Sequence, residues 1–186
     1  MQAPCPWCGT DPLYVRYHDE EWGVPELESR ALWEKLMLDG FQAGLSWITI
    51  LRKRDAFRAA FDGFDPVRVA RYGPEDEARL LSDSGIVRHK GKIRATIRAA
   101  QLYCEIEARE GFATRLWDYV DGQPQVNRWR TMSEVPAKTD LSERISKDLR
   151  AQGFAFCGPT IVYAFMQAVG MVNDHLVTCP RHAALA

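Results

Sequence analysis

Two pairs of potential zinc ligands lie at opposite ends of this 186-residue chain: Cys5 with His18, and His175 with Cys179. A structural zinc takes four thiolate or imidazole ligands and leaves no open position, so these four could close one site. Spacing alone does not select them, because Cys8 forms a Cys-x2-Cys pair with Cys5 and His182 is a further imidazole. Buried thiols and hydrogen-bonded histidines are also common without a metal. The pattern therefore predicts a metal site joining the two ends and leaves its ligand set open.

The composition is that of a globular protein without a disulfide framework. The chain is 46% hydrophobic, and no segment approaches the roughly 20 consecutive apolar residues of a membrane helix. Five cysteines, an odd number, and an N-terminus without a signal-peptide pattern favour the reducing cytoplasm. The formal net charge of -1 shows no basic excess, so a phosphate-binding surface would have to be local. One stretch qualifies, although a solvated helix face also explains it: Arg88, His89, Lys90, Lys92, Arg94 and Arg98.

Helical periodicity runs through nearly the whole chain and predicts an all-α fold of about eight helices, in a single domain spanning residues 1–186. Pro25 precedes one apolar helical run, which we expect to end at Gly40. Asp140 and Glu143 form a capping-box pattern at the start of another helix, which Gly153 ends. No segment alternates apolar and polar residues long enough to require a sheet.

Residues 141–170 have the pattern of a helix-hairpin-helix. Gly153 and Gly158 allow a tight turn between two helices, and the second helix begins near Pro159 and Thr160. The free amides at that helix start could hold a DNA phosphate without any charged side chain. An ordinary helical hairpin with a glycine cap would have the same spacing.

Aromatic residues cluster around one acidic residue in the first quarter of the chain. An enzyme that acts on a DNA base extrudes it from the duplex and stacks it between aromatic faces. The same rings could instead fill the core. They are Trp7, Tyr14, Tyr17, Trp22 and Trp47, with Asp39 as the acid.

Five stretches of the sequence resemble the 3-methyladenine DNA glycosylase I family: DPLY (11–14), YHDEEWGVP (17–25), QAGLSW (42–47), GIVRH (85–89) and VNDH (172–175). The resemblance extends from Cys5 to Cys179. It implies a helix-hairpin-helix DNA glycosylase fold in which a structural zinc ties the termini together. It also implies a monomer that acts on double-stranded alkylated DNA, without a nucleotide cofactor or a membrane.

By this resemblance the zinc ligands are Cys5, His18, His175 and Cys179, which leaves Cys8 outside the site. The family's base pocket corresponds to Trp7, Tyr17, Trp22 and Trp47. Its pocket carboxylate corresponds to Asp39, where the family pattern has Glu, so the acid here is one methylene shorter.

The chemistry of the lesion limits what the site must do. A purine methylated at N3 already carries a positive charge, so the departing base needs no protonation, and recognition of the flipped cation is the main task. Aromatic faces attract cations, and Asp39, if ionised, could accept the exocyclic amino hydrogens. Because residues 151–160 contain no lysine nucleophile, the resemblance suggests a monofunctional enzyme that leaves an abasic site.

Two further residues have assigned roles. Leu45 is the candidate wedge that fills the gap left by a flipped nucleotide, or else a buried leucine. Asp174 occupies roughly the place of a catalytic aspartate in related hairpin enzymes, but we favour a structural role beside His175, as a helix cap or a support for the metal site.

The alternative function is that of a damage-binding protein without hydrolytic activity, which the Asp39 departure supports. Hydrolysis of free nucleosides would leave the hairpin without a purpose.

Overall fold

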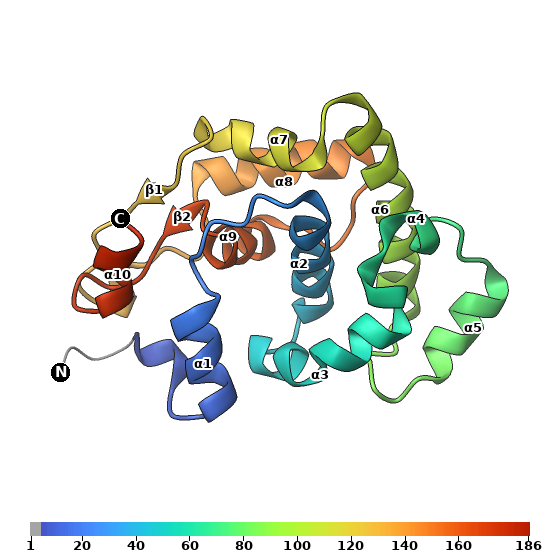
Figure 1. Cartoon of the computed structure of the whole chain (residues 1–186), viewed down its shortest axis with the longest axis horizontal. Coiled ribbons are helices and arrows are strands. Elements are labelled where there is room, and N and C mark those ends of the chain that lie inside the picture. The colour runs from blue at the N-terminus through green and yellow to red at the C-terminus, as the bar shows by residue number, and fades with distance from the viewer. Residues whose placement is uncertain (1–4) are drawn as a thin grey trace.

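The computed structural model describes residues 5–186 and is mostly helical (Figure 1). Within that range the α-helices are α1 (Pro12–Glu20), α2 (Ser29–Gln42), α3 (Trp47–Ala60), α4 (Pro66–Val69), α5 (Pro74–Ser82), α6 (Lys90–Arg109), α7 (Phe112–Trp117), α8 (Asp140–Gln152), α9 (Pro159–Ala168) and α10 (Pro180–Ala184). Short 3-10 helices are η1 (Pro6–Cys8), η2 (Asp62–Phe64), η3 (Asp118–Val120) and η4 (Met132–Glu134). The expected all-α class is confirmed, with ten α-helices instead of about eight in the described residues. None of these helices is long and apolar enough to cross a lipid bilayer.

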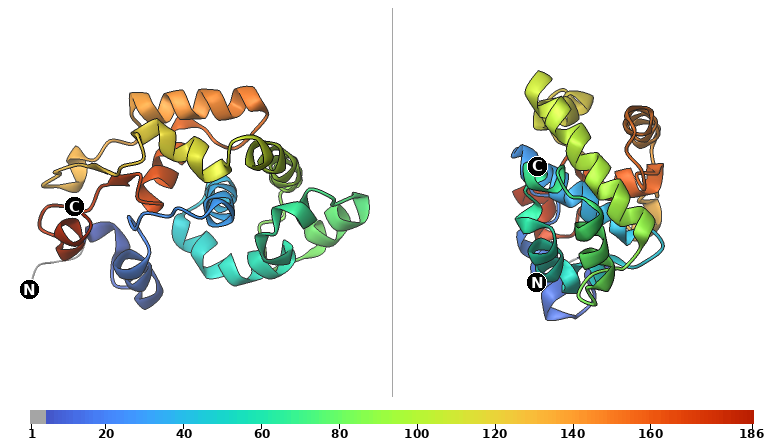
Figure 2. Two further views of the ribbon diagram at one scale, coloured as in Figure 1. Left: turned by 45° about the horizontal axis from the view of Figure 1, so that its top comes forward. Right: turned by 90° about the vertical axis from the view of Figure 1, so that its right-hand side faces the viewer.

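Helix α2 is the centre of the packing. It lies among the other helices (Figure 2) and contacts α3, α6, α7 and α9. Most side chains from Leu32 to Phe41 are buried. Most of this run is apolar, as expected for a helix enclosed by its neighbours, and its charged residues are Glu34, Lys35 and Asp39. The expected helix bounds were wrong here: α2 begins at Ser29 and continues through Gly40 to Gln42. Gly40 is buried inside the helix, where a Cβ would lie 3.5 Å from the carbonyl oxygen of Phe156.

Local capping signals determine where several helices begin. The Asp11 side chain accepts hydrogen bonds from the first-turn amides of α1, and Pro12 occupies the first helical position. The predicted capping box of α8 is displaced by one residue. Thr139 caps the helix and exchanges hydrogen bonds with Ser142, whereas Asp140 is already inside it.

Helices α8 and α9 form the predicted hairpin. Gly153 ends α8 with a left-handed φ of 108°, as a glycine cap does. Gly158 differs from the expectation, because its φ of -62° and ψ of 165° suit any residue. Its backbone does not require glycine, and no described atom lies within 4 Å of the Cβ it lacks. The Ser146 hydroxyl closes the turn by donating to the carbonyl oxygen of Cys157 at 2.7 Å.

The two ends of the described chain meet at one end of the molecule. Helix α1 lies beside the C-terminal α10 in Figure 1, while α5 lies at the opposite end. A two-residue parallel ladder supports this end: β1 (Gln125–Val126) pairs with β2 (Val172–Asn173). It was not expected from the sequence, because two residues are too few to show a strand pattern.

The linker between α1 and α2 crosses the C-terminal end of α9 at very close range. The Gly23 and Glu26 amides donate to the carbonyl oxygens of Ala168 and Val169. Gly170 then turns with a φ of 75°, and a Cβ on it would lie 2.5 Å from the backbone nitrogen of Pro25. Only glycine fits at this crossing, because both the backbone angle and the space exclude a side chain.

We expect Gly170→Ala to destabilise the protein much more than a glycine replacement whose only cost is left-handed backbone strain. Gly122 is the matched control, because its φ of 71° is also left-handed but no described atom lies within 4 Å of its missing Cβ. Gly122→Ala should lower the free energy of unfolding by about 1 to 2 kcal/mol. Gly170→Ala should lower it by about 3 kcal/mol or more, because backbone atoms must also move. Equal losses in denaturant unfolding would contradict the close crossing.

Candidate functional site

The aromatic residues and the acid singled out in the sequence surround one cavity of about 250 Å³. Trp7 comes from η1, Tyr17 from α1 and Trp22 from the turn that follows it. The other lining groups come from α1, α2, α3 and α9, from η4 and the residue after it, and from the residue after β2. The complete lining is Trp7, Tyr14, Tyr17, Trp22, Lys35, Asp39, Gln42, Trp47, Met132, Val135, Ala164, Gln167, Ala168 and Asp174. A concave site with aromatic walls and a few polar groups is the usual form of a small-ligand pocket.

The rings form walls at an angle to one another. The Trp7 and Trp22 centroids are 4.9 Å apart with planes tilted by 58°, and those of Tyr17 and Trp47 are 5.5 Å apart with a tilt of 44°. Such tilted contacts are favourable, and all four of these residues line the cavity. The indole nitrogens of Trp7 and Trp47 are buried without a hydrogen-bond partner among the described residues. Each is a hydrogen-bond donor that the described residues leave unpaired.

Asp39 is the pocket's buried acid, with only 1% of its surface exposed. Its Oδ1 accepts a hydrogen bond from Lys35 Nζ at 2.6 Å, one helical turn earlier on α2. Its Oδ2 is buried and has no partner within residues 5–186. Burial raises the pKa of Asp39, while the Lys35 ammonium opposes that rise. One carboxylate oxygen is therefore held by lysine and the other is an acceptor without a donor.

Tyr17 remains a neutral phenol in this setting. Burial, together with the nearby charge of Asp39, raises its pKa well above the ordinary value of 10. A neutral phenol can both donate and accept a hydrogen bond, as expected of a group that reads the edge of a base.

Several lining residues were not identified from the sequence. Lys35 could have been found, because an i,i+4 lysine faces an aspartate on the same helix. Met132 begins η4 and Val135 follows it, and neither belongs to a sequence motif, so only the folded chain brings them to the pocket.

Asp174 lines the pocket but is fully engaged elsewhere. Its Oδ1 accepts from Asn127 Nδ2 and Trp129 Nε1, and its Oδ2 accepts from Tyr163 and Gln167. Four donors use the lone pairs of a carboxylate. The structural role that the sequence favoured is supported by these bonds, although the partners are neither a helix start nor a metal-site imidazole. Asp174 instead connects the segment after β1 to α9.

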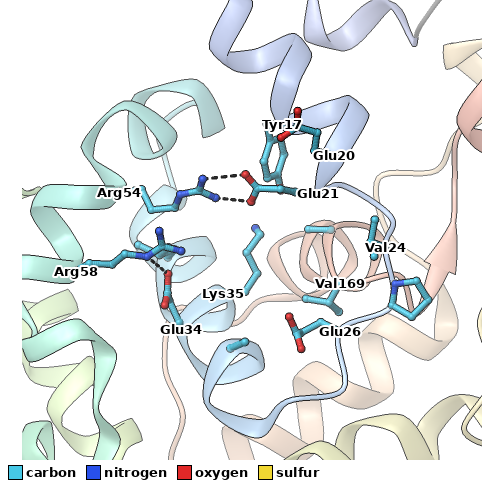
Figure 3. Close-up of a pocket in the computed structure, with 14 residues that line it drawn as sticks. Tyr17, Glu20, Glu21, Val24, Glu26, Glu34, Lys35, Arg54, Arg58 and Val169 are labelled. Atoms are coloured by element: carbon cyan, nitrogen blue, oxygen red, sulfur yellow. Dashed lines mark hydrogen bonds and ion pairs between the residues drawn. The ribbon is translucent and has the colours of Figure 1, made fainter.

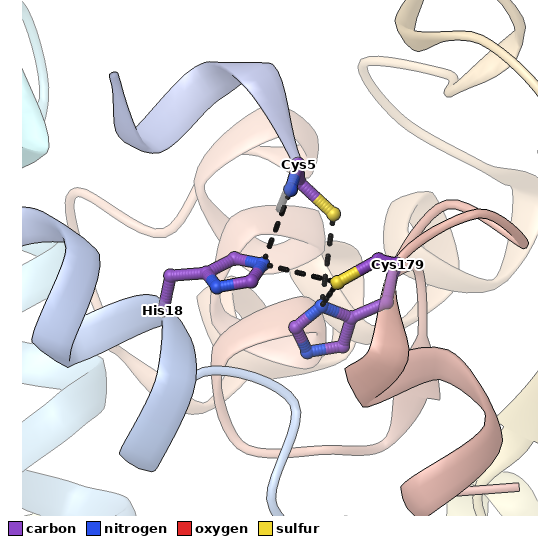
Figure 4. A group of neighbouring side chains, drawn as sticks. Cys5, His18 and Cys179 are labelled. Carbon is purple, nitrogen blue, oxygen red and sulfur yellow. Dashed lines mark hydrogen bonds between the residues drawn. The ribbon is translucent and has the colours of Figure 1, made fainter. Parts of the chain in front are cut away.

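The four ligand residues predicted from the sequence form one buried cluster (Figure 4). The ligand atoms of Cys5, His18, His175 and Cys179 all lie within 4.8 Å of one another. Cys179 Sγ is 3.6 Å from His18 Nε2 and 3.7 Å from His175 Nδ1, and Cys5 Sγ is 3.7 Å from His175 Nδ1. A tetrahedral zinc with ordinary bond lengths would separate sulfur from nitrogen by about 3.5 Å. The cluster thus has the donors and spacing of a structural metal site.

The second ring nitrogen of each histidine has its own partner. His18 Nδ1 lies 2.7 Å from Asp19 Oδ1, and His175 Nε2 lies 3.0 Å from the Trp22 carbonyl oxygen. These acceptors hold a proton on the outer nitrogen and turn the inner lone pair toward the cluster. Burial lowers the pKa of His175 to about 4, which favours the neutral, ligating form. Burial raises the pKa of the Cys5 thiol to about 12, and a bound cation would favour the thiolate instead.

The two alternative ligands lie outside this cluster. Cys8 Sγ donates to the Cys5 carbonyl oxygen at 3.1 Å, and His182 Nε2 lies 2.7 Å from the carbonyl oxygen of Asn127. The ligand set left open by spacing therefore reduces to the Cys2His2 group.

The metal cluster and the aromatic pocket share a wall. The Trp7 ring contacts His18 with centroids 5.4 Å apart, and the Trp22 ring contacts His175 at 4.6 Å. Both tryptophans line the cavity. The positions of these pocket rings therefore depend on the geometry of the cluster.

The loop between α2 and α3 presents Leu45 at the surface. Leu45 is 45% exposed, so it is not the buried leucine of the alternative interpretation. Lys92 Nζ anchors this loop by donating to the carbonyl oxygens of Phe41 and Ala43 at 2.9 and 2.6 Å. The same ammonium lies 5.8 Å from the ring of Phe156, in the turn of the hairpin. Lys92 thus connects the Leu45 loop to the hairpin.

The basic run proposed as a local phosphate-binding stretch is only partly available. Lys92 is buried, as described, and the Arg94 guanidinium donates to Glu77 at 2.8 Å. His89 Nδ1 accepts from the Lys92 amide and caps α6. Much of the run therefore serves the fold, which shifts attention to the hairpin amides as the phosphate-binding groups.

Comparison with known proteins gives a consistent result. The family model for methyladenine glycosylases matches residues 7–182. The chain is 52% identical over 176 residues to the DNA-3-methyladenine glycosylase 1 of Escherichia coli K12, covering 94% of each. A crystal structure of a 3-methyladenine DNA glycosylase I superposes with a TM-score of 0.94 at 49% identity, over 96% of this chain and 98% of that one. The Staphylococcus aureus enzyme, solved for 3-methyladenine recognition, has a TM-score of 0.92 at 40% identity, covering 95% and 94%.

We expect Cys179→Ser to lose the metal and lower the melting temperature, because it removes one of four ligands that join distant segments. Cys8→Ser is the matched control, since a serine hydroxyl can still donate to the Cys5 carbonyl. Elemental analysis of the purified proteins, together with thermal melting, checks both. Wild type without stoichiometric metal, or Cys179→Ser that retains it, would contradict the ligand assignment.

Proposed function

This chain belongs to the methyladenine glycosylase family, and we propose on that premise that it binds the flipped base in the pocket around Asp39 and Trp47. The reaction is removal of 3-methyladenine from alkylated DNA by cleavage of the N-glycosidic bond. The observation that supports this pocket is the buried Asp39 Oδ2, an acceptor without a described partner on the wall of an aromatic cavity. A purine with an exocyclic amino group supplies the donor that such an oxygen lacks.

The pocket groups divide the work of recognition. Asp39 Oδ2 accepts from the amino group and places negative charge near the cationic purine. The Trp47 face attracts the same cation through its quadrupole, and Trp7 and Trp22 complete the walls. Tyr17, as a neutral phenol, contributes a further hydrogen bond to the base edge. Normal adenine lacks the positive charge and gains less from each charged or aromatic contact.

Breaking the bond requires no acid from the protein. The methylated base already carries the charge that protonation would provide, so the bond electrons pass to the purine and neutralise it. An ionised Asp39 stabilises the positive charge of the base before cleavage, and it stabilises the developing oxocarbenium ion during cleavage. Residues 151–160 hold no lysine that could attack the sugar, which supports a monofunctional enzyme leaving an abasic site.

The DNA duplex is held by backbone groups and one apolar side chain. We infer that the first-turn amides of α9, near Thr160, bind a phosphate, and that the turn from Gly153 to Gly158 lets the backbone approach. Leu45 enters the space left by the flipped nucleotide. Lys92 supports this division, because it ties the Leu45 loop to the hairpin turn through its contacts with Ala43 and Phe156.

The metal of the Cys2His2 cluster is inferred to be zinc. Two thiolates and two imidazoles in a closed tetrahedron are typical ligands of structural zinc, and no open position remains for catalysis. The residues that would hold it are Cys5, His18, His175 and Cys179. We further infer that the protein acts on double-stranded DNA as a monomer with one site.

The decisive experiment follows the released base. The protein is incubated with methylated duplex DNA, the soluble fraction is chromatographed, and free methylated nucleoside is tested alongside. We expect 3-methyladenine to be released from DNA only. Tight binding to the damaged duplex without any release would favour the damage-binding alternative.

Asp39→Asn should slow base release steeply. The amide can place a donor against the purine amino group at nearly constant volume, so an attractive contact becomes partly repulsive. Hydrogen bonds to charged groups contribute about 1.5 to 3 kcal/mol, so the single-turnover rate should fall roughly tenfold to a hundredfold. Asp39→Glu should match or exceed the wild-type rate, unless the pocket has closed around the shorter acid.

Asp55→Asn provides the control, because the same change falls on a side chain that is 98% exposed on α3. Thermal melting and metal content must show that each variant is folded. An Asp39→Asn protein that is folded and releases 3-methyladenine at the wild-type rate would remove Asp39 from the mechanism.

Gly158→Leu should weaken binding to all duplexes alike, with or without a lesion, because the side chain would separate the phosphate from the amides of α9. The fold should tolerate it, since the φ and ψ of Gly158 suit any residue. Gly73→Leu is the matched control: this glycine also precedes a proline at a helix start and has no described atom within 4 Å of its missing Cβ. Affinities are measured by fluorescence anisotropy. Loss of lesion discrimination alone would contradict the proposed phosphate contact.

A further inference from the structure

Lys35 lies at the junction of the base pocket and a second cavity. It lines both the pocket of about 250 Å³ and a neighbouring cavity of about 280 Å³. Figure 3 shows its side chain extending from α2 toward the Arg54–Glu21 ion pair, with Glu34 and Arg58 to one side. Its side chain is 16% exposed, so the ammonium is held mainly by protein groups.

The ammonium contacts the two groups proposed to recognise the cationic base. Nζ is 2.6 Å from Asp39 Oδ1 and 3.7 Å from the centroid of the Trp47 ring. Atoms in van der Waals contact are separated by about 3.5 to 4.0 Å, so a purine stacked on this face of Trp47 would need the same space. The ammonium and a base cannot share that face.

Charge is a second reason why the Lys35 ammonium and a methylated base cannot occupy this position together. A cationic purine next to an ammonium in a buried site is repelled, whereas either cation alone is attracted by Asp39 and Trp47. The neighbouring cavity is lined by four glutamates, Glu20, Glu21, Glu26 and Glu34. Glu21 and Glu34 already pair with arginines, but Glu26 has no arginine partner among the described residues. A displaced lysine therefore has an acidic environment within its own cavity.

We propose that Lys35 is a positioning residue whose ammonium holds Asp39 and occupies the cation position on Trp47 in the empty pocket, and yields that position to the methylated base. The inference rests on the proposed role of this pocket in base recognition. It assigns Lys35 a part in specificity, because only a ligand that carries its own positive charge fully replaces the ammonium.

The same exchange favours product release. On cleavage, the electron pair of the glycosidic bond passes to the purine and neutralises its charge. The oxygen of a water molecule bonds to the sugar carbon, and the water proton passes to solvent. The base is then a neutral molecule, while Lys35 is still a cation. The ammonium can return to Trp47 and Asp39 and displace the product.

Lys35→Met tests this, because methionine fills a similar volume without charge. Arg58→Met is the matched control: it removes one positive charge from the same cavity, but Arg58 pairs with Glu34 and not with Asp39. Two quantities are measured for each protein. One is the single-turnover release of 3-methyladenine from methylated duplex between pH 5 and 9, at protein concentrations below saturation, so that the rate reports the ionisation of Asp39 in the empty pocket. The other is the affinity for free 3-methyladenine by tryptophan fluorescence.

The acid limb of the Lys35→Met rate profile should move to higher pH by about one unit, because burial still raises the pKa of Asp39 and no ammonium opposes it. Rate is then lost as pH falls through that raised pKa. Above the acid limb, free base should bind roughly tenfold more tightly, because no cation has to be displaced. The other charged or titratable groups that line the two cavities are Tyr14, Tyr17, Glu20, Glu21, Glu26, Glu34, Arg54, Arg58 and Asp174, and all are unchanged in this variant.

Arg58→Met should leave both quantities at wild-type values. The double variant Lys35→Met/Asp39→Asn should have the same pH profile as Asp39→Asn alone. A folded Lys35→Met protein with the wild-type acid limb and base affinity would overturn the inference and leave Lys35 as a packing residue. If Lys35→Met does not fold, Lys35→Gln gives the same comparison. Wild type that releases no base from DNA would instead overturn the proposed function, so the two failures are distinguishable.

Discussion

A carboxylate buried among aromatic rings on the central helix determines much of what this structure must do. Removing the charge of Asp39 from water is costly unless a cation or a set of donors compensates for it. Lys35, one turn earlier on α2, satisfies Oδ1, and Oδ2 is left without a described partner. The charge of Asp39 is thus only partly compensated, and Asp39 lines the cavity in which a ligand with donors and positive charge would lie. Asp174, in the same pocket, differs from Asp39 because both of its oxygens accept hydrogen bonds, from four donors in total.

The walls around Asp39 depend on contacts between distant parts of the chain. Trp7 and Trp22 pack against the imidazoles of His18 and His175, which belong to the Cys2His2 cluster. The cluster brings the first and last helices together, and its outer histidine nitrogens are held by Asp19 and a backbone carbonyl. The contact between the chain ends and the shape of the pocket therefore depend on the same side chains. Few residues are needed, because the histidines bind in the cluster and also support the pocket tryptophans.

Much of the fold and site could be predicted from local pattern, and the remainder depended on tertiary contacts. Pro159 correctly predicted the start of α9, whereas Gly40 did not end α2, because burial against Phe156 outweighed its helix-breaking tendency. The aromatic residues and the acid of the sequence motifs line one pocket, as expected. The hydrogen-bond partner of each side chain, however, could not be inferred from its residue type. Lys92 resembled a phosphate ligand in the sequence and is instead buried under two carbonyls. The residue type does not distinguish a phosphate-binding lysine from a buried structural lysine, because both have the same ammonium group.

The burial of Lys92 has a consequence for how the protein would search DNA. Counterions are released from DNA in proportion to the phosphates neutralised by lysine and arginine, and this release makes binding sensitive to salt. Here a lysine of the basic run serves the fold, Arg94 pairs with Glu77, and the proposed phosphate contacts are uncharged amides. Arg88, Lys90 and Arg98 of the run are still exposed, so fewer counterions would be displaced than the whole run would displace, and affinity would depend less steeply on ionic strength. Such a protein relies less on long-range electrostatic attraction and more on short-range fit, which suits the search for a rare lesion among many undamaged bases.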